Sequence, residues 1–217
     1  MHLCSLAELE QRGFENLELL PKGVDTELFS PGKRSHLLRR KWGAREGNVV
    51  GLFVGRIAVE KNLQLILRTF LEIQKRIRDF RGVFVGGGPK LEQLKTEFPQ
   101  FIYVGVKRGE ELAEYYASSD LFIFPSTTET FDNVTLEAMA SGLAVVAYDY
   151  AAARQHIVCG ETGFTVPFDQ EDSYIETALF AAQSDLSELR QNRRFSARNV
   201  RWKKVVGRFE KQLSELI

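Results

Sequence analysis

Two glutamates, Glu129 and Glu137, stand eight residues apart between two apolar runs. Residues 121–124 (LFIF) predict a buried parallel strand, and residues 134–141 predict a helix that begins at the carboxyl end of that strand. Open α/β sheets bind ligands at this edge. We therefore expect Glu129, on the connecting loop, to face a reacting centre, and Glu137, about one turn into the helix, to hold another part of the same ligand. The helix start between them offers backbone N–H groups that suit a phosphate.

A pair of cations is expected at the same edge. Arg56 directly follows a predicted strand and Gly55, and Lys61 opens the next predicted helix. A diphosphate is a natural ligand for two converging cations. Glu60, between them, is a candidate ion-pair partner that keeps the cations in place. Position alone leaves other interpretations open, because loop charges are commonly only solvated.

The two glutamates carry alternatives of their own. Glu129 could be a solvated turn residue. Glu137 lies in an apolar helix, where an unpaired carboxylate is costly to bury. The two hydroxyls of a ribose would suit it, because a carboxylate can accept a hydrogen bond from each of them. The other interpretation of Glu137 is a structural salt bridge.

Strand and helix patterns alternate along most of the chain, which predicts an α/β fold with a Rossmann-like, doubly wound parallel sheet. After residue 167 only helical patterns follow. The predicted strands cover residues 17–20, 49–54, 82–85, 101–104, 121–124, 144–148 and 163–166, and the predicted helices cover residues 62–77, 89–97, 110–118 and 134–141.

Composition narrows the class of protein. The chain has 217 residues, of which 44% are hydrophobic and 27% charged, enough for one substantial core. A formal net charge of zero gives no general attraction to nucleic acid. No apolar run approaches the roughly 20 residues that span a bilayer, and the first residues lack the pattern of a secretory signal. A cytoplasmic location is the expectation.

Several blocks, in a fixed order, resemble the retaining nucleotide-sugar glycosyltransferases of glycosyltransferase family 4, which have the GT-B fold. The Glu-x7-Glu pattern of Glu129 and Glu137 is one, and together the blocks span roughly residues 17–170. Residues 133–157 look most like bacterial α-mannosyltransferases and glycolipid glucosyltransferases. The other blocks are residues 21–31 (PKGVDTELFSP), 54–62 (VGRIAVEKN), 85–89 (VGGGP), 120–126 (DLFIFPS) and 137–142 (EAMASG).

The resemblance implies a role for each of these charges. Glu129 lies beside the transferred sugar and supports the transition state, where its charge could stabilise an oxocarbenium ion. Arg56 and Lys61 hold the donor pyrophosphate and stabilise the leaving group, so these three residues are the predicted catalytic set. Glu137 binds the ribose. The fold implied is the C-terminal half of a GT-B enzyme.

The remaining predicted donor contacts are mainly backbone groups. In the family, the turn before helix 134–141 caps the phosphates, and the loop at residues 105–108, between strand 101–104 and helix 110–118, commonly contacts the base. Asp132 departs from the usual Gly, so it either caps the helix or weakens donor affinity. Ala144 stands where Pro is common, and residues 86–88 are expected to line the cleft as a turn. The predicted donor set is Gly55, Arg56, Lys61, Val106, Lys107, Glu129, Thr130, Phe131, Asp132, Asn133, Val134 and Glu137.

Neither a metal nor another cofactor is expected. The sequence has no Asp-x-Asp pair, and its three histidines lack ligand spacing. Cys4 and Cys159 are too few and too isolated for a metal site or a disulfide framework. Leaving-group charge would then fall to Arg56, Lys61 and helix dipoles.

The resemblance also divides the chain. Residues 1–20 are expected to be a remnant of the interdomain hinge, residues 21–185 the donor-binding domain, and residues 186–217 helices that pack toward an N-terminal acceptor domain missing from this chain. Either the chain was shortened, or its gene encodes only the donor-binding half. The basic stretch 190–211, which carries Trp202 and Phe209, has a second interpretation as a peripheral membrane contact.

The predicted function is transfer of a hexose, of mannose or glucose type, from a GDP or UDP sugar to a hydroxyl acceptor. The resemblance implies retention of configuration. The isolated chain is expected to bind nucleotide and to transfer little or no sugar. Two alternatives remain: a non-catalytic nucleotide-sugar module or subunit of a split enzyme, and sugar-nucleotide epimerisation.

Overall fold

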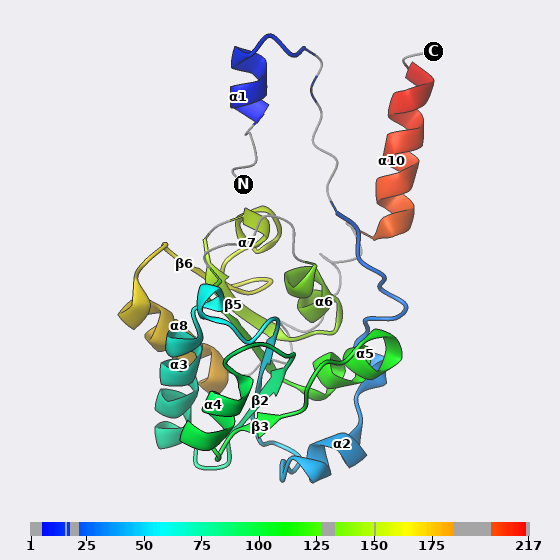
Figure 1. The fold of residues 1–217 in the computed structure, drawn as a ribbon. Coiled ribbons are helices and arrows are strands. Elements are labelled where there is room, and N and C mark those ends of the chain that lie inside the picture. Colours follow the sequence, from blue (N-terminus) through cyan, green and yellow to red (C-terminus); the bar gives the residue numbers. More distant parts are fainter. Residues whose placement is uncertain are drawn as a thin grey trace.

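A six-stranded parallel sheet forms the centre of the computed structural model (Figure 1). The model describes residues 6–15, 17, 22–126, 133–149, 151–184 and 201–215. The strand order is β3-β2-β1-β4-β5-β6, and every neighbouring pair is parallel. This is the order of a doubly wound sheet, and it confirms the predicted fold class.

The described strands form where apolar runs predicted them. Each pattern from residue 49 onward gives a strand, although the run 101–104 pairs over only two residues. Predicted strand 17–20 lies mostly outside the described residues. The strands are β1 (Val50–Val54), β2 (Arg81–Val85), β3 (Ile102–Tyr103), β4 (Leu121–Phe124), β5 (Ala144–Tyr148) and β6 (Phe164–Val166).

Helices cover the sheet. Helices α3 and α8 pack side by side, and α8 also contacts β5 and β6 (Figure 1). Helix α3 begins one residue later than predicted because Asn62 has a left-handed backbone, with φ of 52°. The helices around the sheet are α3 (Leu63–Arg76), α4 (Leu91–Glu97), α5 (Gly109–Ser118), α6 (Val134–Ala140), α7 (Ala151–His156) and α8 (Glu171–Gln183).

A buried ion cluster ties the chain before β1 to the start of β4. Asp120 accepts hydrogen bonds from Arg34 at 2.8 Å, from Arg39 at 2.9 Å and from the backbone N–H of Val50 at 2.9 Å. Arg39 is almost fully buried and lies in α2 (His36–Lys41), a short helix that the sequence pattern did not predict. Because each buried charge has several partners, the cluster can be tolerated inside the fold.

Two helices extend from the same side of the molecule: α1 (Leu6–Gln11) and α10 (Trp202–Glu215) (Figure 1). The base of α10 rests on the chain before β1, where Trp202 packs so closely on Gly23 that a Cβ there would lie 2.6 Å from the Trp202 ring. The Trp202 N–H also donates to the Val24 carbonyl at 3.4 Å. These contacts join two segments that are far apart in sequence.

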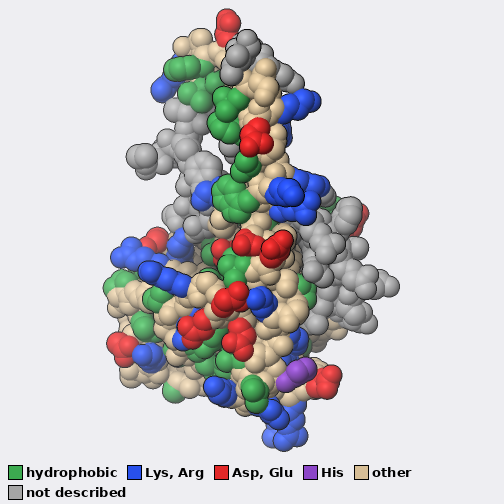
Figure 2. Space-filling model, turned by 90° about the vertical axis from the view of Figure 1, so that its right-hand side faces the viewer, with side chains coloured by type: hydrophobic (Ala, Val, Ile, Leu, Met, Phe, Trp, Pro, Cys, Tyr) green, Lys and Arg blue, Asp and Glu red, His purple; other side chains and the backbone are tan. Residues whose placement is uncertain are grey.

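The rest of α10 shows an apolar line to solvent. Trp202, Val206, Phe209 and Leu213 are each 45–48% exposed. Figure 2 shows green apolar side chains beside blue Lys and Arg on the projecting part of the molecule. Among the described residues, no helix has the length and apolar character needed to cross a bilayer. Both predicted domain boundaries, at residues 20/21 and 185/186, fall at positions outside the described ranges.

Candidate donor-binding site

The sheet order creates one topological switch point, between β1 and β4. From β1 the chain continues to β2 on one side, and from β4 it continues to β5 on the other. Loops that diverge in this way leave a crevice at the carboxyl edge of the sheet. The loop that follows β1 carries Arg56 and Lys61, and β4 is followed by Pro125 and Ser126. The sequence-predicted cations and the loop that leads to Glu129 therefore start from adjacent strands.

Arg56 is mainly exposed to solvent. Its side chain is 66% exposed and forms an ion pair with Glu60 over 3.1 Å. Glu60 was expected to hold the cations in place, and it has this contact with Arg56. Exposed pairs contribute less than about 1 kcal/mol. An anionic ligand could therefore replace Glu60 as the partner of Arg56 at little energetic cost.

Lys61 connects the β1 loop to the end of β4. Its ammonium nitrogen lies 6.0 Å from the centre of the Phe124 ring, a cation–π contact. The Phe124 ring is in turn stacked on Phe53, with ring centres 6.5 Å apart. Because Phe124 is the last residue of β4, the position of Lys61 depends on where this strand ends.

Close backbone packing joins the loops after β1 and β2. The Gly55 N–H donates to the Val85 carbonyl at 3.0 Å, and the Ile57 N–H donates to the Gly87 carbonyl at 2.9 Å. A Cβ on Gly86 would lie 1.9 Å from the Gly55 carbonyl oxygen. Only glycine fits such an approach. The expected turn at residues 86–88 therefore lies directly against the loop of Arg56.

The loop after β3 continues this edge. The Gly86 N–H donates to the Gly105 carbonyl at 2.8 Å. Val106 is exposed and lies near Gly87, where a Cβ would be 3.2 Å from a Val106 methyl group. Lys107 forms an ion pair with Glu111 and lies over the Tyr115 ring at 5.5 Å. The hydrogen bond to Glu111 raises the pKa of Lys107. The Lys107 side chain is thus engaged with its own following helix.

Helix α6 carries the second predicted carboxylate. Glu137 is its fourth residue and is half-buried between the buried Leu136 and Ala138. Asn133 and Val134, at the start of α6, are also half-buried, and the buried Asn133 Oδ1 has no hydrogen-bond partner among the described residues. Four predicted contacts lie outside the described residues, and their placement stays a prediction: Glu129, Thr130, Phe131 and Asp132.

Tyr174 is a neighbour of this site that sequence reasoning missed. It is fully buried in α8, and its hydroxyl accepts from the Phe124 N–H at 2.9 Å and donates to the Val146 carbonyl at 2.5 Å. Burial raises the pKa of Tyr174 well above its usual value. No local pattern marked this residue, because its partners lie 28 and 50 positions away in the sequence.

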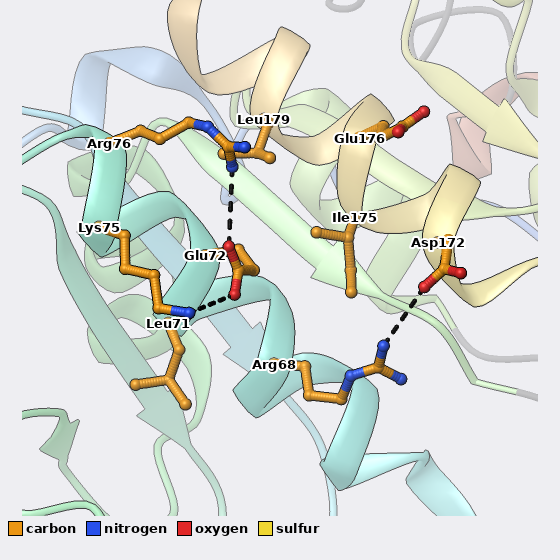
Figure 3. A pocket seen from close by; sticks show the side chains of 9 residues that line it. All are labelled: Arg68, Leu71, Glu72, Lys75, Arg76, Asp172, Ile175, Glu176 and Leu179. Carbon is orange, nitrogen blue, oxygen red and sulfur yellow. Dashed lines mark hydrogen bonds and ion pairs between the residues drawn. The ribbon is translucent and has the colours of Figure 1, made fainter.

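A separate hollow of about 600 Å³ lies between α3 and α8 (Figure 3). Its cations have carboxylate partners nearby: Arg68 pairs with Asp172 at 3.4 Å, and Lys75 pairs with Glu72 at 2.5 Å. The Lys75 contact lowers the pKa of Glu72. None of the residues that line this hollow belongs to the predicted donor set.

Relatives of this chain are glycosyltransferases. An α-mannosyltransferase of Mycobacterium tuberculosis, described as GDP-mannose-dependent, is 34% identical over 176 residues, which cover 81% of this chain and 45% of that protein. A sulfoquinovosyl transferase of Arabidopsis thaliana is 40% identical over 168 residues, covering 72% of this chain and 31% of that protein. The chain thus spans less than half the length of these two relatives.

Solved glycosyltransferases share the fold. HepE of Anabaena, whose structure contains UDP and glucose, has a TM-score of 0.78 and 19% identity, over 96% of this chain and 60% of that one. The C-terminal domain of LpcC from Francisella tularensis, a group 1 glycosyl transferase, has a TM-score of 0.67 and 23% identity, over 82% and 97% of the two chains. The predicted fold, a Rossmann-like sheet domain of the kind found in GT-B glycosyltransferases, is confirmed. The family described as glycosyl transferases group 1 matches residues 48–183, more than half of the sequence, and the chain belongs to that family.

Proposed function

We propose that this chain binds a nucleotide diphosphate sugar and supplies the donor half of a retaining hexosyltransferase. The observation that carries the proposal is that the loop with Arg56 and Lys61 follows β1 at the β1–β4 switch point, and that Lys61 contacts Phe124, the end of the strand that leads to Glu129. A diphosphate suits such an edge because it carries two negative charges that two neighbouring cations can meet.

Each group then has a role in transfer. Arg56 and Lys61 hold the diphosphate and stabilise its charge as the sugar departs. Glu129 lies beside the transferred sugar and stabilises positive charge at its anomeric carbon. Glu137 accepts hydrogen bonds from both ribose hydroxyls, a role that fits a half-buried carboxylate on the fourth residue of α6. No metal is needed in this proposal, because these cations meet the leaving-group charge.

The base is read by the loop after β3. Lys107 is paired with Glu111, so we assign base contacts to the backbone of Val106 and Lys107 and to the exposed Val106 side chain. Among donors we favour GDP-mannose, since relatives at 33–38% identity are named as GDP-mannose-dependent mannosyltransferases. The acceptor is a hydroxyl compound.

Transfer needs an acceptor half in addition to the donor half that we propose here. The matched relatives are more than twice as long as the region they share with it. We propose that residues 186–217 pack toward the acceptor domain, with the apolar line of α10 as the contact. The chain alone is then expected to bind nucleotide and to turn over little or no sugar. Measurable transfer by the purified chain to any hydroxyl acceptor would contradict this expectation.

Two other functions use the same fold. A non-catalytic nucleotide-sugar module, or the donor subunit of a split enzyme, would bind the donor in the same way and differ only in its partner. Sugar-nucleotide epimerisation would also begin with donor binding, and analysis of products after reconstitution with an acceptor half separates it from transfer. The Glu129 and Glu137 pattern favours transfer.

The test is calorimetric titration of the purified chain with GDP and with UDP. We expect one nucleotide to bind selectively, and Glu137→Gln, which keeps the size and removes the charge, to weaken it about tenfold. Glu176→Gln is the matched control, because Glu176 lines the separate hollow between α3 and α8. Absence of binding by either nucleotide, or equal effects of the two variants, would refute the donor-site proposal.

A further inference from the structure

The Tyr174 hydroxyl joins two adjacent strands, β4 and β5, near the carboxyl edge of the sheet. It accepts from the Phe124 N–H on β4 at 2.9 Å and donates to the Val146 carbonyl on β5 at 2.5 Å. A tyrosine hydroxyl has one proton to donate and lone pairs to accept, so both functions are used here. The ring is fully buried and meets Tyr148 edge-on, with ring centres 5.2 Å apart. The hydroxyl is therefore held in one position.

One of the two atoms that it holds, the Phe124 nitrogen, lies at the end of β4. Phe124 is the last residue of this strand and pairs with Ala147 of β5. Its ring lies under Lys61, 6.0 Å from the ammonium nitrogen. A continuous series of contacts thus leads from the Tyr174 hydroxyl through the Phe124 backbone and ring to Lys61. A shift of Phe124 would move the surface on which the cation rests.

We propose that Tyr174 is a positioning residue for the donor diphosphate. It acts through Phe124, whose fixed ring keeps Lys61 at the β1–β4 switch point. The inference rests on the proposed function, because it assigns Lys61 to the diphosphate. It predicts a selective defect: loss of the hydroxyl should weaken recognition of the terminal phosphate and leave the contacts to the base, ribose and first phosphate intact.

The test compares nucleoside diphosphate with monophosphate binding. GDP and GMP, or UDP and UMP if the chain selects uridine, are titrated into the chain and into Tyr174→Phe, which keeps the ring. We expect the ratio of diphosphate to monophosphate affinity to fall about fivefold, because removal of the hydroxyl breaks both hydrogen bonds that fix the end of β4. A purely structural role would weaken both ligands equally or neither, and an unchanged ratio overturns the proposal.

Tyr103→Phe is the matched control. Its hydroxyl also bonds to backbone, at 3.1 Å from the Leu94 carbonyl and 3.2 Å from the Phe98 carbonyl, but on β3, away from the switch point. We expect this variant to keep the normal ratio. If Tyr174→Phe does not fold, Phe124→Leu replaces it, because removal of the ring under Lys61 should lower the same ratio. A chain that binds neither diphosphate defeats the proposed function itself, whereas normal binding with an unchanged ratio defeats only the role of Tyr174.

Discussion

Two arginines of this chain, Arg39 and Arg56, lie in very different surroundings. Arg39 is buried and bonded to Asp120, so loss of either partner would leave a buried charge and cost roughly 3–5 kcal/mol. Arg56 is largely exposed, and its pair with Glu60 contributes little. Arg39 is thus held by several partners, whereas Arg56, which we propose binds the diphosphate, has an exposed partner that a ligand could replace.

The partial burial of His156 predicts how the stability of the fold depends on pH. It lies at the end of α7, and burial lowers its pKa below the usual value of 6.5. Protonation therefore favours the unfolded chain, and stability is lost as the pH falls from about 6.5 toward the lower pKa of the folded state. Between pH 7.5 and 5.5 we expect the unfolding temperature to fall less for His156→Gln than for the parent chain. Thermal unfolding followed by circular dichroism measures this difference.

The control for this experiment is His36→Gln, because His36 is exposed at the start of α2. It should follow the parent chain at each pH. A His156→Gln curve parallel to that of the parent would show that this histidine does not contribute to the acid sensitivity of the fold.

At the scale of elements, the carboxyl edge of the sheet is built from loops that contact one another through their backbones. The loops after β1, β2 and β3 are joined by hydrogen bonds that involve Gly55, Gly86, Gly87 and Gly105. At Gly86 a side chain would hold two of these loops apart, because its Cβ would lie 1.9 Å from the Gly55 carbonyl oxygen. The Arg56 loop therefore takes its position from the neighbouring loop as well as from its own strand.

Gly86→Ala should separate these loops. The new Cβ would lie 1.9 Å from the Gly55 carbonyl oxygen, and the residue has φ of 143°. We expect a loss of stability of about 2 kcal/mol or more, together with loss of nucleotide binding. Urea unfolding and calorimetric titration measure the two effects.

Gly47→Ala isolates the contribution of the backbone angle. Gly47 also has a positive φ, of 83°, but it has no atom within 4 Å of its Cβ position and lies before β1. This variant should lose about 1 kcal/mol of stability and keep its nucleotide affinity. Equal losses of affinity in the two variants would argue against a specific role for the contact between the loops.

The strands and the order of motifs could be predicted from sequence, because buried parallel strands are continuous apolar runs bounded by glycines. Helix α2 could not, since six mostly polar residues show little helical periodicity and its N-cap, Ser35, is a common residue. The position of Arg56 and Lys61 on the loop after β1 could be predicted, and their role as a diphosphate site stays a prediction. Tyr174 was not predicted, because its role depends on two strands distant in sequence that only the folded sheet brings to it.

At the scale of the whole molecule, a compact sheet domain carries a helix that projects from it. Helix α10 is anchored at its first turn by Trp202 on Gly23 and by the buried Val205. Its apolar line then continues into solvent through Val206, Phe209 and Leu213. Such a line on a projecting helix indicates a contact surface. We assign this surface to the acceptor half proposed above.

In the absence of that half, the apolar line should make the chain associate with itself. We expect sedimentation equilibrium of the purified chain to give a weight-average molecular mass that rises with protein concentration. Phe209→Ser combined with Leu213→Ser should give a monomer under the same conditions, because the exposed apolar line is shortened. Lys211→Ser changes the opposite side of α10 by helical spacing and should leave association unchanged. A parent chain that stays monomeric at every concentration would show that this apolar line is stable when exposed to solvent. The assignment of α10 to a domain contact would then fail.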